Sequence, residues 1–187
     1  MSDKHNTRPA GSVTSWLRHY RKAMRDGTGT NVPCGDCTAC CRSNEYIVLQ
    51  ADEVAQFDNV VTNPDGEPSI ETLPDGRCPY LDNEGCSVYA TRPRNCRDFD
   101  CRAMLFCRAL PTDRPLIAEA LNQWAPGYKT AEDHITGLAL RMAARDLHGR
   151  GYAVDKAAAL AALRTYEQFL PEAREAYRRE RAGGGKQ

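Results

Sequence analysis

Four cysteines near the start of the chain have the spacing of a metal-binding run. They read Cys34-x2-Cys37-x2-Cys40-Cys41. A C-x2-C turn places two thiolates on one side of a tight loop, which suits a single metal ion or one edge of a cluster. Gly35 favours such a turn, because glycine can adopt a positive φ. The longer C-x2-C-x2-C spacing is the one found in iron–sulfur binding runs.

A second group of cysteines follows about forty residues later. It consists of four thiols: Cys78, Cys86, Cys96 and Cys101. Iron–sulfur runs take a fourth ligand from further along the chain, often followed by proline, and Cys78-Pro79 fits that description. Cys40 and Cys41 are adjacent, and adjacent side chains rarely converge on one ion. We therefore expect either that these two serve neighbouring centres or that one is a spare thiol.

Positive charge accompanies the second cysteine group. Residues 92–108 contain five arginines against two aspartates, a local excess of three positive charges. The arginines are Arg92, Arg94, Arg97, Arg102 and Arg108. Arginine N–H groups that donate to thiolate sulfur stabilise its charge, favour metallation and raise the potential of an iron centre. Each arginine could equally belong to a solvated face. Asp36, Asp98 and Asp100 are expected to be caps or arginine partners rather than oxygen ligands.

The clustering favours metal binding over disulfides or core packing. All nine cysteines fall between residues 34 and 107. The first twelve residues are polar, with no apolar leader, so we expect a reducing, cytoplasmic location, where thiols more often bind metal or catalyse than form disulfides. Cys107 follows Met104-Leu105-Phe106 and is expected to be a core residue. The four histidines, His5, His19, His134 and His148, lie outside the cysteine region and are expected at the surface.

In these residues the chain resembles the CxxCxxCC family of zinc- or iron-chelating proteins, which are often described as iron–sulfur proteins. The resemblance spans roughly residues 32–102. Besides the first cysteine run, it rests on these elements: Cys78-Pro79-x-Leu81, Cys86-x-Val88-Tyr89, Arg92-Pro93-x2-Cys96-Arg97 and Asp100-Cys101. It implies that eight cysteines form the metal-binding pattern: Cys34, Cys37, Cys40, Cys41, Cys78, Cys86, Cys96 and Cys101. Cys107 lies outside that pattern.

Composition restricts the other partners. The chain has 187 residues and equal numbers of basic and acidic side chains, 25 of each. A nucleic-acid partner usually requires a basic excess, so none is expected. The longest apolar run, residues 157–163, is too short to span a bilayer, so no membrane partner is expected. The sequence does not indicate a protein partner. Because it contains no phosphate-binding loop, dinucleotide-binding glycine run or nucleophile elbow, enzymatic activity stays an open question.

Periodicity predicts the elements of the N-terminal half. Apolar residues recur at i, i+3, i+4 and i+7 from Val13, which predicts a helix over 13–24 that ends at Gly27. Residues 1–12 are expected to be a flexible tail. Further along, short apolar runs and turn residues predict the following elements: a strand at 46–49, a helical turn at 52–57, loops or a hairpin over 62–77 and a strand at 87–89.

The C-terminal half has a helical pattern. A helix is predicted from Pro115 to Trp124, and a capping box over 130–133 predicts the start of the next helix, which stops near Gly149. Asp155 is expected to cap a last helix in which Pro171 is a kink or a break. The final residues, 178–187, are expected to be a frayed tail.

These observations predict a mainly α fold with little β structure and an irregular cysteine-rich module that metal stabilises. Three parts are expected: a tail and helix over 1–30, the metal-binding domain over 31–110 and a helical region over 111–187. The first function predicted is chelation of zinc or iron, the latter as an ion or in an iron–sulfur cluster. The alternatives are a redox protein, whose iron–sulfur cluster transfers electrons or supports a modification reaction, and an interaction adaptor shaped by metal.

Overall fold

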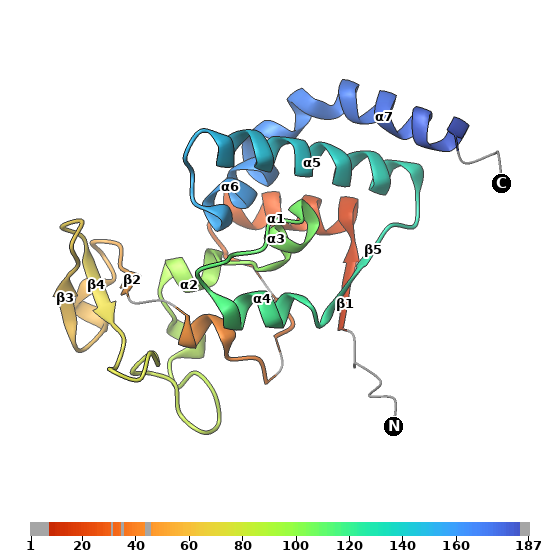
Figure 1. Cartoon of the computed structure of the whole chain (residues 1–187). Helices are drawn as coiled ribbons and strands as arrows, with labels where there is room; N and C mark the ends of the chain where they lie inside the picture. The colour runs from red at the N-terminus through yellow and green to blue at the C-terminus, as the bar shows by residue number, and fades with distance from the viewer. Residues whose placement is uncertain (1–7, 31, 35, 44–45, 184–187) are drawn as a thin grey trace, which may run out of the picture. The chain divides into compact units, whose positions relative to one another are not determined.

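The protein divides into two compact units. The computed structural model describes residues 8–183 except 31, 35, 44 and 45 (Figure 1). Helices make up 53% of the structure and strands 12%, which confirms the mainly α prediction. Unit 1 contains Met1–Lys22, Cys101–Asp113 and Leu121–Gln187, and unit 2 contains Ala23–Asp100 and Arg114–Ala120.

The first helix has the face that the sequence predicts. Helix α1 (Val13–Asp26) buries Val13, Trp16, Leu17 and Tyr20, the members of the 3.6-residue repeat. Gly27 follows with a φ of 65°, a left-handed conformation that glycine adopts without a Cβ clash and that commonly ends helices.

Helix α5 (Ala131–Gly149) is the centre of unit 1. It packs against α3 (Arg102–Cys107), α6 (Val154–Leu160) and α7 (Leu170–Gly183), and Figure 1 shows α7 running alongside it. Its buried face consists mainly of small residues: Thr136, Gly137, Ala139, Leu140, Ala143, Ala144 and Leu147. Small side chains allow helices to pack closely, so the other helices surround α5.

The predicted capping box opens α5 and also holds α1. The Thr130 hydroxyl accepts the Asp133 backbone N–H, and the Asp133 side chain accepts the Thr130 N–H. The same carboxylate accepts from the Thr14 hydroxyl at 2.7 Å and the Thr14 N–H at 3.1 Å. Burial by itself would raise the pKa of Asp133, but the hydrogen bonds from Thr14, Thr130 and the Lys129 backbone outweigh it and lower the pKa to about 2.

A two-stranded parallel sheet corrects two sequence predictions. Strand β1 (Arg8–Ser12) pairs with β5 (Trp124–Gly127). Residues 8–12 are therefore not a tail, and residues 1–7 lie outside the described part of the chain. Trp124 belongs to this strand, because α4 (Pro115–Leu121) ends three residues before it. Gly127 permits the pairing, since a Cβ there would lie 2.8 Å from the Gly11 carbonyl oxygen.

The last part of the chain, where a single helix was expected, contains two α-helices with other helical segments between them. A π-helical segment (Ala161–Thr165) and a 3-10 segment (Tyr166–Phe169) separate α6 from α7. Ala153 is the N-cap of α6, and Asp155 lies in its first turn. Pro171 occupies the first turn of α7, where proline is tolerated. Helix α7 continues to Gly183, so 178–183 is helical rather than frayed, while 184–187 lies outside the described residues.

Unit 2 is built on a small antiparallel sheet in the order β2-β4-β3. The strands are β2 (Tyr46–Val48), β3 (Val60–Thr62) and β4 (Pro68–Glu71). Between β3 and β4 the Asn63 side chain accepts the backbone N–H groups of Asp65 and Glu67, which confirms the predicted hairpin. The sheet packs on a small cluster of buried residues: Ile47, Leu49, Phe57, Ile70, Cys78 and Leu81.

The rest of unit 2 consists of short helical turns. They are η1 (Ala39–Arg42), η2 (Val54–Gln56), η3 (Tyr89–Thr91) and α2 (Arg94–Asp98). The strand predicted at 87–89 is wrong, because the Tyr89 N–H bonds to the Cys86 carbonyl at 3.1 Å and the Thr91 N–H to the Val88 carbonyl at 3.0 Å. Such three-residue bonds close 3-10 turns.

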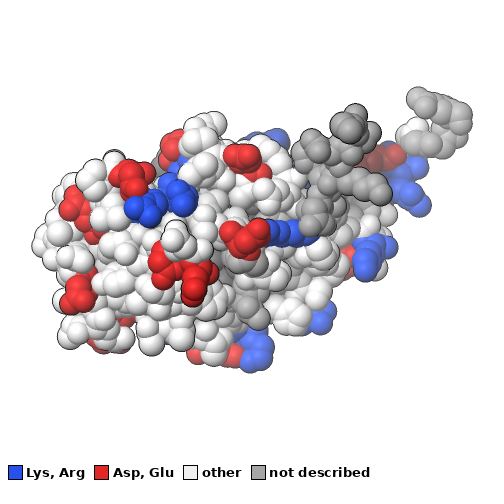
Figure 2. All heavy atoms as spheres, turned by 90° about the horizontal axis from the view of Figure 1, so that it is seen from below, with Lys and Arg blue, Asp and Glu red and all other residues white. Residues whose placement is uncertain are grey.

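The surface carries side chains of both charges. On the face seen in Figure 2, basic and acidic side chains are interspersed. None of the helices in the described ranges is long and apolar enough to cross a bilayer.

Candidate metal centre

Backbone turns shape the first cysteine run. The Cys37 N–H bonds to the Cys34 carbonyl at 3.1 Å, which closes a turn around the first C-x2-C pair. The Cys41 N–H bonds to the Thr38 carbonyl at 3.0 Å, so Cys40 and Cys41 lie on η1. The turn role expected of Gly35 lies outside the described residues. All four cysteines of this run are partly buried.

The second run returns to the first through a backbone hydrogen bond. The Cys78 N–H donates to the Cys41 carbonyl at 2.8 Å. After Cys78 the chain folds back, with a β-bridge between Leu81 and Cys86. Gly85, just before Cys86, has a φ of 126°, a region that favours glycine, as the sequence predicts. Cys78 and Cys86 therefore belong to one short hairpin that begins beside Cys41.

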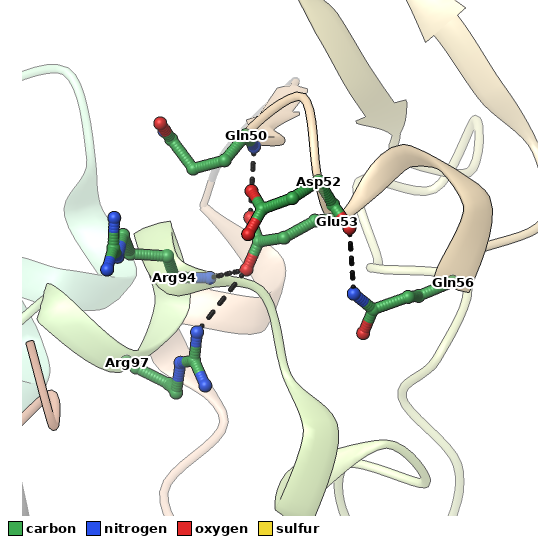
Figure 3. A network of polar contacts seen from close by, with 6 residues as sticks. All are labelled: Gln50, Asp52, Glu53, Gln56, Arg94 and Arg97. Atoms are coloured by element: carbon green, nitrogen blue, oxygen red, sulfur yellow. Dashed lines mark hydrogen bonds and ion pairs between the residues drawn. The ribbon is translucent and has the colours of Figure 1, made fainter.

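Cys96 lies on α2. Together with Cys41 it packs against the buried core of unit 2. A buried carboxylate holds the start of α2: Glu53 accepts the Arg94 N–H at 2.6 Å and pairs with the Arg97 guanidinium at 3.4 Å (Figure 3). Its second oxygen accepts the Gln50 N–H at 2.9 Å. Glu53 thus connects the segment around η2 to the helix that carries Cys96.

Electrostatic coupling indicates that the thiols are neighbours. Burial, together with the charges of Cys40, Cys78 and Cys86, raises the pKa of Cys96 to about 12. Burial likewise raises the pKa of Cys78, and Cys86 and Cys40 add to the shift. Burial also raises the pKa of Cys34 to about 11, with contributions from Cys40 and Cys37. Seven cysteines from three stretches of chain therefore influence one another as a group.

The adjacent pair is internally hydrogen bonded. The Cys41 thiol donates to the Cys40 sulfur, and this bond lowers the pKa of Cys40 to about 7. The same bond raises the pKa of Cys41, and burial and the charges of the neighbouring thiols act in the same direction. In the metal-free centre this bond favours the thiolate form of Cys40 and the protonated form of Cys41.

The thiols are gathered without being arranged as a finished coordination shell. Among the residues that the structure describes, no group of three or more Cys, His, Asp or Glu side chains is arranged so that it could hold a metal ion. The chemistry of the donors still suits zinc and iron, since sulfur ligands are the ones that both accept in closed sites. A bound cation would offset both causes of the raised pKa values, the burial of the thiols and the mutual repulsion of their thiolates.

The two remaining cysteines belong to unit 1. Cys101 is partly buried and precedes α3 as its N-cap residue. Cys107 is buried on α3, where its thiol lies 3.8 Å from the Ala158 carbonyl oxygen, and burial raises its pKa to about 12. Cys107 is therefore a core residue, as the sequence predicts.

The charged residues divide into different environments. Burial raises the pKa of Asp98, and the charges of Arg94 and Arg97 lower it, so this aspartate has arginine neighbours, as expected. Asp100 is buried and its charge raises the pKa of Cys34. Of the histidines, His19, His134 and His148 are exposed as predicted, and His5 lies outside the described residues.

A polar cavity of about 220 Å³ lies next to α2. Its walls include Glu53, Arg94 and Arg97, and no cysteine is among the described residues that line it. The cavity is therefore separate from the gathered thiols. The polar network that Figure 3 shows forms part of its wall.

These observations define the class of protein: a mainly helical chain that contains a cysteine-rich module of gathered thiols. Residues 33–123 match the model of the CxxCxxCC family, whose description is "Putative zinc- or iron-chelating domain". The match confirms the resemblance read from the cysteine spacing and supports metal binding. No curated protein and no solved structure matches the chain.

Sequence reasoning missed Glu53. The residue lies in a short turn with no periodic pattern, and its main partners, Arg94 and Arg97, are about forty residues away. Thr30 was missed for the same reason: it is buried, and its hydroxyl donates to the Arg97 carbonyl oxygen at 3.0 Å. Only the local Gln50–Glu53 hydrogen bond has a spacing that sequence could have suggested.

Proposed function

We propose that residues 31–110 form a domain that binds zinc or iron through cysteine thiolates. The ligands are drawn from the eight cysteines of the family pattern: Cys34, Cys37, Cys40, Cys41, Cys78, Cys86, Cys96 and Cys101. The observation that supports this proposal is the convergence of seven of these thiols, from three stretches of chain, into one electrostatically coupled group.

Energetics support a metal as the missing partner of this group. The buried core of unit 2 is small, so apolar burial contributes little stability there. Structural zinc contributes on the order of 10–16 kcal/mol to small cysteine-rich peptides. Because metal binding couples to folding, the final ligand geometry forms when the ion enters and draws the sulfurs together.

The test is metal analysis of protein prepared without oxygen, with two matched variants. Cys96→Ala removes a thiol of the coupled group, whereas Cys107→Ala removes a buried thiol from the core of unit 1. We expect stoichiometric zinc or iron in the natural sequence and in Cys107→Ala, and weaker or sub-stoichiometric binding in Cys96→Ala. Material that holds no transition metal, and takes up neither zinc nor iron when they are supplied, would refute the proposal.

The same preparation separates the forms of the metal. A brown protein with broad absorbance near ~400 nm and acid-labile sulfide indicates an iron–sulfur cluster and favours a redox role. A colourless protein with bound zinc indicates a closed structural or delivery site.

A further inference from the structure

Arg92 has a buried donor without an acceptor. Its Nε–H group is shielded from solvent, and no hydrogen-bond partner for it is found among the described residues. A buried polar group without a partner is unfavourable, and in native structures it usually marks a missing water, ion or ligand. This nitrogen therefore needs an explanation from the function of the site.

The rest of the guanidinium is held in place. It stacks over the ring of Tyr89, with its central carbon 4.0 Å from the ring centroid. Its terminal Nη2 lies 3.5 Å from the Thr30 carbonyl oxygen. The Thr30 N–H is in turn bonded to the Arg97 carbonyl at 2.7 Å. These contacts orient the planar group, so the free Nε–H has a defined direction.

The charge of this guanidinium influences thiols of both cysteine runs. Its charge acts on Cys34 in the first loop, on Cys40 in η1 and on Cys96 in α2. In each case the positive charge favours the thiolate. Arg92 is thus a positive charge shared by thiols of the two runs.

The other arginines of the sequence pattern have different roles. Arg97 pairs with Glu53, and Arg94 is exposed, with its backbone N–H donated to the same carboxylate. Arg102 and Arg108 belong to unit 1, where Arg108 is the C-cap of α3 with a φ of 50°. From composition alone, the five arginines were equivalent candidates for stabilising thiolate charge. The structure distinguishes Arg92 by its buried, unpartnered Nε–H group.

We propose that Arg92 donates its Nε–H to a metal-bound cysteine sulfur when the centre is loaded, and so stabilises the negative charge of the thiolate shell. This inference rests on the proposed metal-binding function. Arginine suits the role because its guanidinium stays charged and presents fixed, planar donors. Hydrogen bonds from such neighbours tune a metal site and strengthen its hold on the ion.

The test uses Co²⁺ alone as the probe, because cobalt bound to thiolates has a sulfur-to-metal charge-transfer absorption. Arg92→Met removes the donor and the charge. Arg94→Met makes the same chemical change two residues away, on an exposed side chain. We expect Arg92→Met to weaken Co²⁺ binding ~10–100-fold and to move the charge-transfer band to lower energy, since sulfur that loses a hydrogen bond gives up electron density more easily. Arg94→Met should leave both properties unchanged.

A third variant separates the hydrogen bond from structure. Arg92→Lys keeps the charge without the oriented Nε–H, so we expect partly weakened binding and a shifted band. If Arg92→Met does not fold, the band of Arg92→Lys decides: a shift supports the proposal and an unshifted band overturns it. If Arg92→Met leaves the Co²⁺ affinity and the charge-transfer band unchanged, or if Arg94→Met changes them equally, the role proposed for Arg92 is overturned. The proposed metal-binding function would not be affected by that result. Failure of the natural sequence to bind any of Co²⁺, zinc and iron would overturn the proposed function as well.

Discussion

Glu53 is expected to control the stability of the cysteine module, although it is not a metal ligand. The change to make is Glu53→Gln, which keeps the size of the side chain and removes its charge. Figure 3 shows that the carboxylate accepts from Gln50, Arg94 and Arg97 at once. A glutamine amide has one acceptor oxygen, and its NH₂ group would face a backbone N–H donor. One buried N–H group therefore loses its partner.

The magnitude follows from these contacts. The two backbone bonds, at 2.6 and 2.9 Å, are short and charge-assisted, and such bonds contribute about 1.5–3 kcal/mol each. The ion pair is weaker, because its N–O distance is 3.4 Å and the Arg97 side chain is 38% exposed. We therefore expect Glu53→Gln to lower the free energy of unfolding of unit 2 by ~2–4 kcal/mol.

The assay is urea unfolding of the zinc-loaded protein followed by circular dichroism, with a separate Co²⁺ titration of each variant. Asp52→Asn is the control, because Asp52 is the exposed neighbouring residue and only its backbone carbonyl takes part in the network. Apparent Co²⁺ affinity should fall in Glu53→Gln, since α2 carries Cys96, and should stay constant in Asp52→Asn. A loss of stability below ~0.5 kcal/mol in Glu53→Gln, the range of ordinary surface substitutions, would refute this reasoning.

Three further outcomes are expected. Chelation of the metal should unfold residues 30–105 and leave the C-terminal helices partly intact, and protease resistance across that segment after chelation would contradict this. Asp133→Asn should cost ~2 kcal/mol at pH 7, because the folded-state pKa of about 2 lies below the ordinary 3.8. Since that pKa is depressed, the natural sequence should lose the same contribution as the pH falls from about 4 to about 2 while the variant does not, and equal acid curves would exclude it. Gly29→Ala should cost ~2–4 kcal/mol in thermal unfolding, because Gly29 has a φ of 73° and its Cβ would lie 2.6 Å from another side-chain carbon. Gly66→Ala has a similar φ of 82° and open space, so it should cost only ~1 kcal/mol, and equal losses in the two variants would show that the contact is unimportant.

Local signals in the sequence were sufficient for several elements. The buried face of α1, the capping box at Thr130 and the hairpin turn at Asn63 were all predictable. Each depends on residues within about one or two turns of one another, where periodicity and capping chemistry are read directly. The spacing of the cysteines was likewise sufficient for the family resemblance that the match over residues 33–123 confirms.

Errors arose where partners distant in the sequence decide the conformation. Residues 8–12 form a strand only because residues 124–127 lie beside them, and the same pairing takes Trp124 out of the predicted helix. The strand predicted at 87–89 failed for a different, local reason, because 3-10 hydrogen bonds between residues three apart close that segment. An apolar or β-branched pattern does not tell which backbone groups will pair, so propensity yields to tertiary contacts.

By itself, the sequence determined the chemistry: which residues are thiols, how they are spaced and that their surroundings are basic. Only the tertiary structure decided which of these residues act together. It brings Cys78 beside Cys41 through one backbone bond, anchors the helix of Cys96 through Glu53 and singles out Arg92 from five arginines. The physical reason is that burial and orientation belong to the folded chain, and a donor or a charge gains its effect only when folding removes water and sets its neighbours.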